Sequence, residues 1–266
     1  DIHPLLKFLI CDVVTTIIIF IFSWIFQNSS VYDPYWSVLP MVALPLFIDF
    51  KNTNEAFILI IIVLALVELW GLRLTINWAI HFKNLKQEDW RYTKFRTEHP
   101  KIFPLINFTG IHLVPTIVVY LVMLSPIALI QAVQNGTLTN GFNVSSILAI
   151  LIALAGILFE LIADVQSMYY RKKYPGKLLD NGIWKNSRHP NYLGEIVFWF
   201  GIYLLLISVD TNMWFLFLGP LANLLMFAFI SIPLMEKHLL KKHPEYKEQI
   251  TNKNVLLIFP KKKVNK

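Results

Sequence analysis

Two carboxylates lie within one turn of each other at the end of a long apolar segment. Glu160 and Asp164 are four residues apart, next to the apolar run 147–163, so on a helix both side chains lie on one face. Ionisable residues are costly at membrane depth, which makes each of them a candidate functional residue. The alternative is that both acids pair with arginines of neighbouring loops and only hold the helices together.

A second polar group precedes the apolar run 196–209. Pro190 suits the first turn of a helix, and Arg188 and His189 stand directly before it. The first N–H groups of a helix, beside two such side chains, favour an anion such as a phosphate. The polar residues that follow are Asn191, Tyr192 and Glu195. A helix cap with interfacial tyrosine and arginine anchors explains the same pattern equally well.

The elements that must position these residues are membrane-spanning helices. Hydrophobic residues make up 56% of the chain and charged residues only 15%. A soluble domain of this length needs more polar residues to cover its core. Runs that reach or approach the roughly 20 residues of a span are 5–26, 56–69, 111–130, 147–163, 196–209 and 214–234. A seventh run, 38–50, is shorter and contains Pro40 and Pro45, which predicts a kinked span or a re-entrant segment. No run alternates with period two. The sequence therefore predicts an all-α, multi-pass membrane bundle of about seven transmembrane helices.

The basic residues predict the orientation of this bundle. All lysines and arginines except Lys7, Lys51 and Arg73 fall in segments 81–108, 170–191 and from 237 onward. With seven spans these segments share one face, which the positive-inside rule places in the cytoplasm or the mitochondrial matrix. We expect the C-terminus on that face, the N-terminus on the other, and the endoplasmic reticulum or the mitochondrial inner membrane as location. Anionic lipid headgroups explain the net charge of +7, so we expect no nucleic-acid partner. The single cysteine, Cys11, excludes an intrachain disulfide and a cysteine-based metal site, and no metal site is predicted.

Six short motifs resemble one family of membrane enzymes. In chain order they are Asp33-Pro-Tyr-Trp-Ser37, Trp70-Gly-Leu-Arg-Leu74, Glu88-Asp-Trp-Arg-Tyr92, Phe159-Glu-x-x-x-Asp164, Ser187-Arg-His-Pro-Asn-Tyr-Leu-Gly-Glu195 and Pro233-Leu-Met-Glu236. The Arg-His-Pro-x-Tyr-x-Gly motif resembles one found in a superfamily of membrane enzymes. This superfamily includes steroid 5-alpha-reductases, sterol reductases and isoprenylcysteine carboxyl methyltransferases. The six motifs together resemble its steroid-reductase-like branch.

This resemblance implies a seven-span reductase that binds NADPH in the half nearest to the basic loops. The cofactor contacts that it implies fall on Arg73, Arg91, Glu160, Asp164, Arg171, Asn191 and Glu195, with Arg188, His189 and Tyr192 in the same motif as the last two. It also implies a catalytic carboxylate at Asp33, kept protonated by desolvation, and a catalytic tyrosine at the position of Trp70. Trp70 is a departure, because an indole N–H only donates, whereas a tyrosine hydroxyl also accepts. Tyr35, beside Asp33, is the residue that can supply the hydroxyl instead.

The function expected from the resemblance is hydride transfer from NADPH to the C=C of a lipophilic enone, a step of lipid metabolism. The substrate would enter from the bilayer, and membrane lipids would surround the protein. We expect one membrane domain over residues 1–266: 1–76 on the substrate side, 77–110 as an interfacial loop or helix, 111–236 on the cofactor side, and 237–266 as a tail. Two alternatives remain. Trp70 favours a non-catalytic subunit of a larger membrane assembly, and the Arg-His-Pro-x-Tyr motif also fits an S-adenosylmethionine-dependent methyltransferase.

Overall fold

Six long apolar helices dominate the part of the chain that the computed structural model describes, residues 2–261. Each is long and apolar enough to cross a membrane: Pro4–Ile25 (α1), Phe57–His81 (α3), Phe103–Gln134 (α5, η3 and α6), Val144–Lys173 (α7), Pro190–Val209 (α8) and Thr211–Lys242 (η5, α9, η6 and α10). Within the described residues the only β-type pairing is an isolated bridge between Ser187 and Asn254. The predicted all-α, multi-pass membrane class is confirmed.

The expected kinked segment 38–50 forms two short helices. Tyr35–Ala43 is a nine-residue α-helix (α2), and Leu44–Phe47 continues it as a four-residue 3-10 helix (η2). Together they rise about 22 Å, less than the roughly 30 Å of a hydrocarbon core. Pro45 has no N–H to donate and its ring crowds the preceding turn, which ends α2 at this point.

The expected interfacial segment 77–110 is shared among several helices. The long helix α3 continues past its apolar run and ends at His81. Trp90–Glu98 (α4) then begins at Asp89, whose carboxylate accepts a hydrogen bond of 2.9 Å from the backbone N–H of Arg91. Phe103–Ile106 (α5) leads through a π-helix, Asn107–Leu113 (η3), into Val114–Gln134 (α6). Of these helices, α4 is the one that is separate from the long apolar helices.

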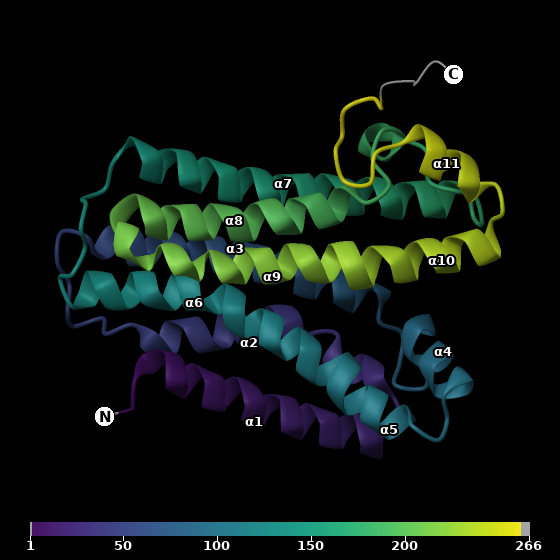
Figure 1. The fold of residues 1–266 in the computed structure, drawn as a ribbon, viewed down its shortest axis with the longest axis horizontal. Helices are drawn as coiled ribbons and strands as arrows, with labels where there is room; N and C mark the ends of the chain where they lie inside the picture. Colours follow the sequence, from purple (N-terminus) through teal and green to yellow (C-terminus); the bar gives the residue numbers. More distant parts are fainter. Residues whose placement is uncertain (1, 262–266) are drawn as a thin grey trace. The chain divides into compact units, whose positions relative to one another are not determined.

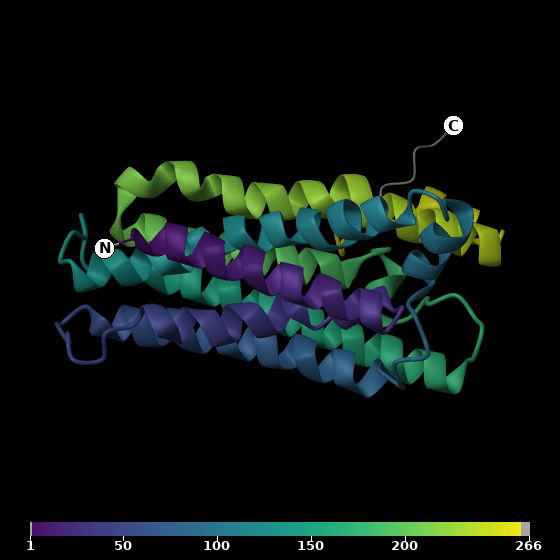
Figure 2. The ribbon, with the colours of Figure 1, turned by 90° about the horizontal axis from the view of Figure 1, so that it is seen from below.

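The helices divide into two compact units. The first contains the chain up to Asn143 together with Leu206–Gly219. In it α1 packs on α6 and α2 packs on α3, and Figures 1 and 2 both show α1 alongside α6. Phe8 of α1 stacks on Tyr120 of α6 with ring centroids 5.9 Å apart. At one end of this unit, Asn52 and Asn54 donate to the backbone carbonyls of Gln134 and Val133, so the loop after η2 meets the last turn of α6 there.

The second unit contains Val144–Leu205 and the chain from Pro220 onward. Its helices α7 and α8 lie side by side (Figure 1) and approach closely where their side chains are small. A Cβ placed on Gly156 of α7 would lie 2.5 Å from the backbone nitrogen of Phe198, and one on Gly201 of α8 would lie 2.5 Å from that of Ala153. Such contacts between glycine-containing faces are typical of helix pairs in membranes.

The second unit ends in a short helix and an extended segment. Beyond α10, Tyr246–Asn252 (α11) follows, and the chain then runs back beside the residues that precede α8. A 3-10 turn, Gly182–Lys185 (η4), lies between α7 and α8. In the described residues, the expected tail therefore consists of the end of α10, the helix α11 and an extended segment.

Candidate functional site

A buried chain of hydroxyl groups leads away from a carboxylate in the first unit. Asp12 of α1 is 0% exposed, and its carboxylate accepts a hydrogen bond from the hydroxyl of Tyr35, the first residue of α2. Thr16 lies one turn after Asp12 on the same face of α1, and its hydroxyl donates to the Tyr35 oxygen at 3.1 Å. The Thr16 oxygen is also 2.6 Å from that of Thr116 on α6, which is 2.9 Å from the Tyr32 hydroxyl. Three helices and η1 (Ser29–Tyr32) thus contribute to one connected polar group.

This group can carry a proton if its hydroxyls rotate, because the Thr116 hydroxyl also donates to the carbonyl of His112 at 2.9 Å. Adjacent hydroxyls each donate and accept, so a proton can move along them when the carboxylate is protonated. Among the described residues, neither Oδ2 of Asp12 nor Nε2 of His112 has a hydrogen-bond partner. The His112 ring lies against Tyr32, with centroids 4.7 Å apart. Two buried polar atoms at this group therefore remain available to a bound molecule.

The sequence interpretation missed Asp12, Thr16, Tyr32 and Thr116. One signal was present, since Asp12 is a carboxylate in the middle of the first span, and such residues are functional candidates by default. The threonines and Tyr32 carried no comparable signal, because a hydroxyl is common in a span and gains significance only from its neighbours.

Asp33 belongs to a different polar group, with residues of α4. Its Oδ1 accepts a 2.6 Å hydrogen bond from the Tyr92 hydroxyl and lies 3.9 Å from a guanidinium nitrogen of Arg91. Arg91 in turn forms a 2.7 Å ion pair with Asp89. Burial raises the pKa of Asp33 to about 6, although Arg91 and Tyr92 act in the opposite direction. The structure thus places the expected acid, Asp33, with Arg91, whereas Tyr35 has Asp12 as its carboxylate partner.

Trp70 and Arg73 both lie on α3 and are buried. Trp70 is 2% exposed and Arg73 is 9% exposed. Between them, Gly71 brings α3 against α2, because a Cβ there would lie 3.1 Å from the carbonyl oxygen of Ser37. Gly71 thus lies at the α2–α3 contact of the first unit, and Trp70 and Arg73 are buried residues on either side of it in α3.

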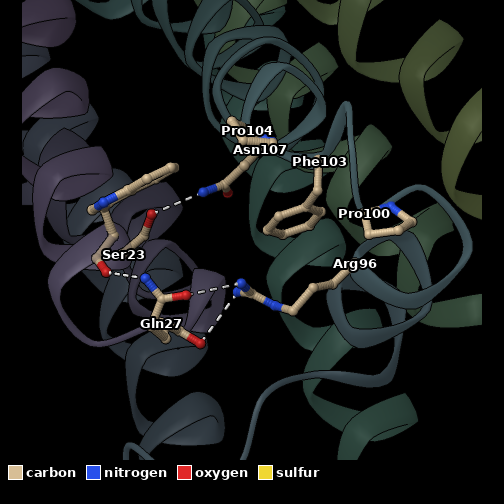
Figure 3. Close-up of a pocket in the computed structure, with 8 residues that line it drawn as sticks. Ser23, Gln27, Arg96, Pro100, Phe103, Pro104 and Asn107 are labelled. Atoms are coloured by element: carbon tan, nitrogen blue, oxygen red, sulfur yellow. Dashed lines mark hydrogen bonds between the residues drawn. The ribbon is translucent and has the colours of Figure 1, made fainter.

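A pocket of about 190 Å³ lies between the end of α1 and the segment from α4 to η3 (Figure 3). The Arg96 guanidinium closes its polar side through hydrogen bonds to Gln27 and Glu88, and Arg96 also lies over the Phe103 ring at 4.2 Å. Asn107 donates to the Ser23 hydroxyl at 3.1 Å. None of the residues expected from the sequence to bind cofactor or substrate lines this pocket.

In the second unit, the contact between α7 and α8 brings two buried glutamates close together. Glu160 is 5% exposed, and a Cβ on Gly194 would lie 2.7 Å from its Cβ. Glu195 follows Gly194 directly and accepts a 2.8 Å hydrogen bond from the Trp199 indole. One turn away on the two helices are Asp164 and Asn191, both half-buried. Four of the expected cofactor residues are thus collected along one helix–helix contact.

Arg188 and His189 make contacts within the protein. The Arg188 guanidinium pairs with Glu236 of α10 at 2.7 Å and donates to the carbonyls of Ile250 and Lys253 at 2.9 and 3.1 Å. Nε2 of His189 is 3.1 Å from the same Glu236 oxygen. The His189 ring stacks on Tyr192. Glu236 lies in the Pro-Leu-Met-Glu motif, but nothing in that motif singles it out as the partner of this arginine.

The extended segment after α11 closes over the start of α8. The backbone N–H groups of Arg188 and His189 donate to the carbonyls of Asn254 and Val255, each at 3.0 Å. The buried Lys253 ammonium donates to the Trp184 carbonyl at 2.8 Å and pairs with Asp180 at 3.0 Å. Burial lowers the pKa of Lys253, and Asp180 partly offsets this effect. We call residues 253–256 with 186–189 the C-terminal clasp.

Arg171 has a different environment from the other expected residues. It lies in the last turn of α7 with Lys172 and Lys173 and is exposed. The structure therefore does not bring it into the buried contact of Glu160 and Glu195, but it leaves its guanidinium accessible to a ligand.

Comparison with known proteins places the chain in a family. The family described as "Protein of unknown function (DUF1295)" matches residues 19–252. The chain belongs to this family. An uncharacterised protein of Schizosaccharomyces pombe is 28% identical over 201 residues, which are 67% of this chain and 57% of the yeast protein. The chain thus spans little more than half the length of this relative. No solved structure matches.

The matched region contains all the expected site residues, from Asp33 to Glu195. It begins after Asp12 and Thr16, so the family match does not bear on these two members of the hydroxyl chain.

Proposed function

We propose that the protein is an NADPH-dependent, steroid 5-alpha-reductase-like reductase that acts on a lipophilic enone. The observation that carries this proposal is the Tyr35 hydroxyl, held by the buried Asp12 carboxylate and continued by Thr16, Thr116 and Tyr32. Reduction of a C=C conjugated to a carbonyl develops negative charge on the carbonyl oxygen. A positioned hydroxyl in a dry site stabilises that charge and can deliver a proton.

The residues of the first unit have separate roles in this proposal. Asp12, when protonated, donates to Tyr35, whose own hydrogen is then free to bond the substrate oxygen. The proton that Tyr35 gives to the substrate ends on the carbon next to the carbonyl. The threonine hydroxyls and Tyr32 then return a proton to Tyr35. Asp33, held by Tyr92, is the second candidate acid, and Trp70 contributes a flat apolar wall.

The second unit offers groups that fit NADPH, which when bound supplies the hydride. Glu160, Asn191 and Glu195 present carboxylate and amide groups that can accept hydrogen bonds from hydroxyl and amide groups of the cofactor. The exposed guanidinium of Arg171 suits a phosphate. Arg73, Arg91 and Asp164 complete the proposed contacts.

Arg188, His189 and Tyr192 act less directly in this proposal. Both side chains that would face an anion are engaged with Glu236. Their proposed role is to fix the first turn of α8, and with it Asn191 and Glu195, in the orientation that the cofactor requires.

The test uses the purified full chain in lipid nanodiscs. We expect enone-dependent oxidation of NADPH, followed at 340 nm, with a 3-keto-4-ene steroid or a polyprenyl enal as substrate. Tyr35→Phe should slow the reaction by about a hundredfold or more and leave the affinity for NADPH unchanged. Tyr120→Phe is the matched control, because it removes a hydroxyl from a tyrosine of the same unit that stacks on Phe8 and lies outside the hydroxyl chain.

One alternative retains support from a specific observation. Trp70, at the position where the resemblance implies a tyrosine, is 2% exposed, as expected of a residue kept for packing in a non-catalytic subunit. NADPH binding without reduction of any enone would favour that function. Binding of S-adenosylmethionine in place of NADPH would establish the methyltransferase.

A further inference from the structure

The end of α7 carries a concentration of positive charge. Arg171, Lys172 and Lys173 form its last turn, and Lys177 follows four residues later. No ion pair joins any of these four side chains to a carboxylate within the described part of the chain. The nearest acid after them in sequence, Asp180, pairs with Lys253. This surface therefore has a positive charge that the protein itself does not neutralise.

Two of these ammonium groups converge on one aromatic ring. Nζ of Lys173 lies 5.3 Å from the centroid of the Tyr174 ring, and Nζ of Lys177 lies 5.6 Å from it. Tyr170 packs against the same ring at 5.0 Å. Two like charges beside the same ring repel each other, and an anion bound near both would reduce that repulsion.

The surface beside these residues is hollow and aromatic. Its volume is about 450 Å³, and it is lined by Tyr169, Tyr170, Lys172, Lys173, Tyr174 and Asn181. Tyrosine and lysine together are typical of the membrane interface, where one end of the side chain is apolar and the other is hydrated.

An exposed apolar stripe leads along α7 to this hollow. Leu158, Leu161, Ile162 and Val165 are all exposed on the helix, and Tyr169, 68% exposed, follows them. A molecule with its anionic group in the hollow would therefore have its apolar part against the helix surface that faces the hydrocarbon core.

We infer that this surface is a binding site for an anionic phospholipid. The phosphate lies between Lys173 and Lys177, the headgroup fills the tyrosine-lined hollow, and an acyl chain follows the stripe on α7. Juxtamembrane lysines and arginines attract anionic lipids in this manner. A soluble phosphate compound would neutralise the lysines but leave the apolar stripe on α7 exposed. A phospholipid would do both, and we therefore take the lipid as the occupant.

The experiment measures lipid retention by the full chain in detergent with native mass spectrometry. Dioleoylphosphatidylglycerol should bind at least tenfold more strongly than dioleoylphosphatidylcholine. Lys173→Gln with Lys177→Gln should reduce this preference about tenfold or more. The matched control is Lys241→Gln with Lys242→Gln, at the end of α10 in the same unit, which removes the same charge and should leave the preference unchanged.

Two competitors distinguish the lipid from a soluble anion. Glycerophosphoglycerol, which is the headgroup without chains, and NADPH should both fail to displace the lipid at equal concentration. Displacement by either would overturn the assignment to a lipid. An equal loss of the preference for phosphatidylglycerol in both double variants would overturn it as well. The loss would then result from the change in net charge and not from the position of the lysines. The wild-type comparison of the two phospholipids requires no variant, and equal binding of both would overturn the site.

Discussion

At the scale of single residues, the most consequential pair is Asp12 and Tyr35. Replacing Asp12 with asparagine keeps the shape of the side chain and its ability to bond the Tyr35 hydroxyl, but it removes the acidic proton. We expect Asp12→Asn to slow enone reduction by about a hundredfold or more, with helical content by circular dichroism and NADPH affinity unchanged. Unaltered turnover in this variant would restrict Asp12 to a packing role.

The pH dependence of stability tests the environment of Asp33. Its pKa is raised from 3.8 to about 6 in the folded protein, so between these values the folded state holds a proton that the unfolded state has lost. This contribution is fully present below about pH 4 and is lost as pH rises through about 6.

Asp33→Asn should remove this contribution. We expect the difference in Tm between wild type and variant, measured in detergent by intrinsic fluorescence, to change by several degrees from pH 4 to pH 7, with the wild type losing stability relative to the variant. Parallel curves would show that Asp33 is solvated despite its place beside Arg91, Tyr92, Asp89 and Glu88.

The sequence predicted part of the residue-level arrangement. Glu160 and Asp164 could be placed together because a four-residue spacing fixes their face of the helix. The pairing of Tyr35 with Asp12 could not be predicted, because it depends on which face of α1 meets α2, and hydropathy is nearly uniform around α1. The same reason explains why the partner of Arg188 was not foreseen.

At the scale of elements, the close contact of α7 and α8 makes a prediction about stability. Gly156→Ala would place a Cβ about 2.5 Å from the backbone of Phe198, which forces the helices apart and costs about 1–3 kcal/mol. We expect a clear fall in Tm and, if the proposed function is correct, weaker NADPH binding, because Glu160 and Glu195 lie at this contact.

The control for this element is Gly141→Ala. A Cβ there meets no atom within 4 Å, so Tm should remain within about a degree of the wild type. Equal Tm values for Gly156→Ala and wild type would mean that the helices separate without cost, contrary to the packing described here.

Hydropathy predicted where the helices are but not always where they end. The apolar run 56–69 stops before Trp70, whereas α3 continues to His81. Polar residues such as Arg73 remain helical because the backbone hydrogen bonds of the helix are already in place and neighbouring helices cover this side. The apolar run 56–69 alone does not show which helices pack against the residues that follow it.

At the scale of the whole molecule, the positive charges predict which segments share a side of the membrane. In a Cys11→Ser background, Asn140→Cys lies in the uncharged loop after α6 and Lys172→Cys lies in the last turn of α7. Because lysines and arginines are retained on the cytoplasmic or matrix side, we expect a membrane-impermeant maleimide to label these two cysteines from opposite sides. Labelling of both from one side would rule out the orientation.

The sequence predicted the all-α, multi-pass membrane class and about seven spans, and residues 2–261 contain six helices long enough to cross a membrane. The sequence did not predict the division into two compact units, since that depends on which helices pack together. Nor did the apolar run 38–50 show that it would fold into two short helices, α2 and η2, with a total rise of about 22 Å.

The C-terminal clasp has a consequence for the order of events during synthesis. Ser187 donates to the carbonyl of Val255, which is made 68 residues later, about 3–14 s at typical rates of translation. A ribosome therefore delivers α8 to the membrane well before the start of that helix has its partners. A premature stop between residues 243 and 253 would therefore yield a chain that retains every long apolar helix but lacks the clasp. The defect would lie on the polar surface of the protein and not in the bilayer.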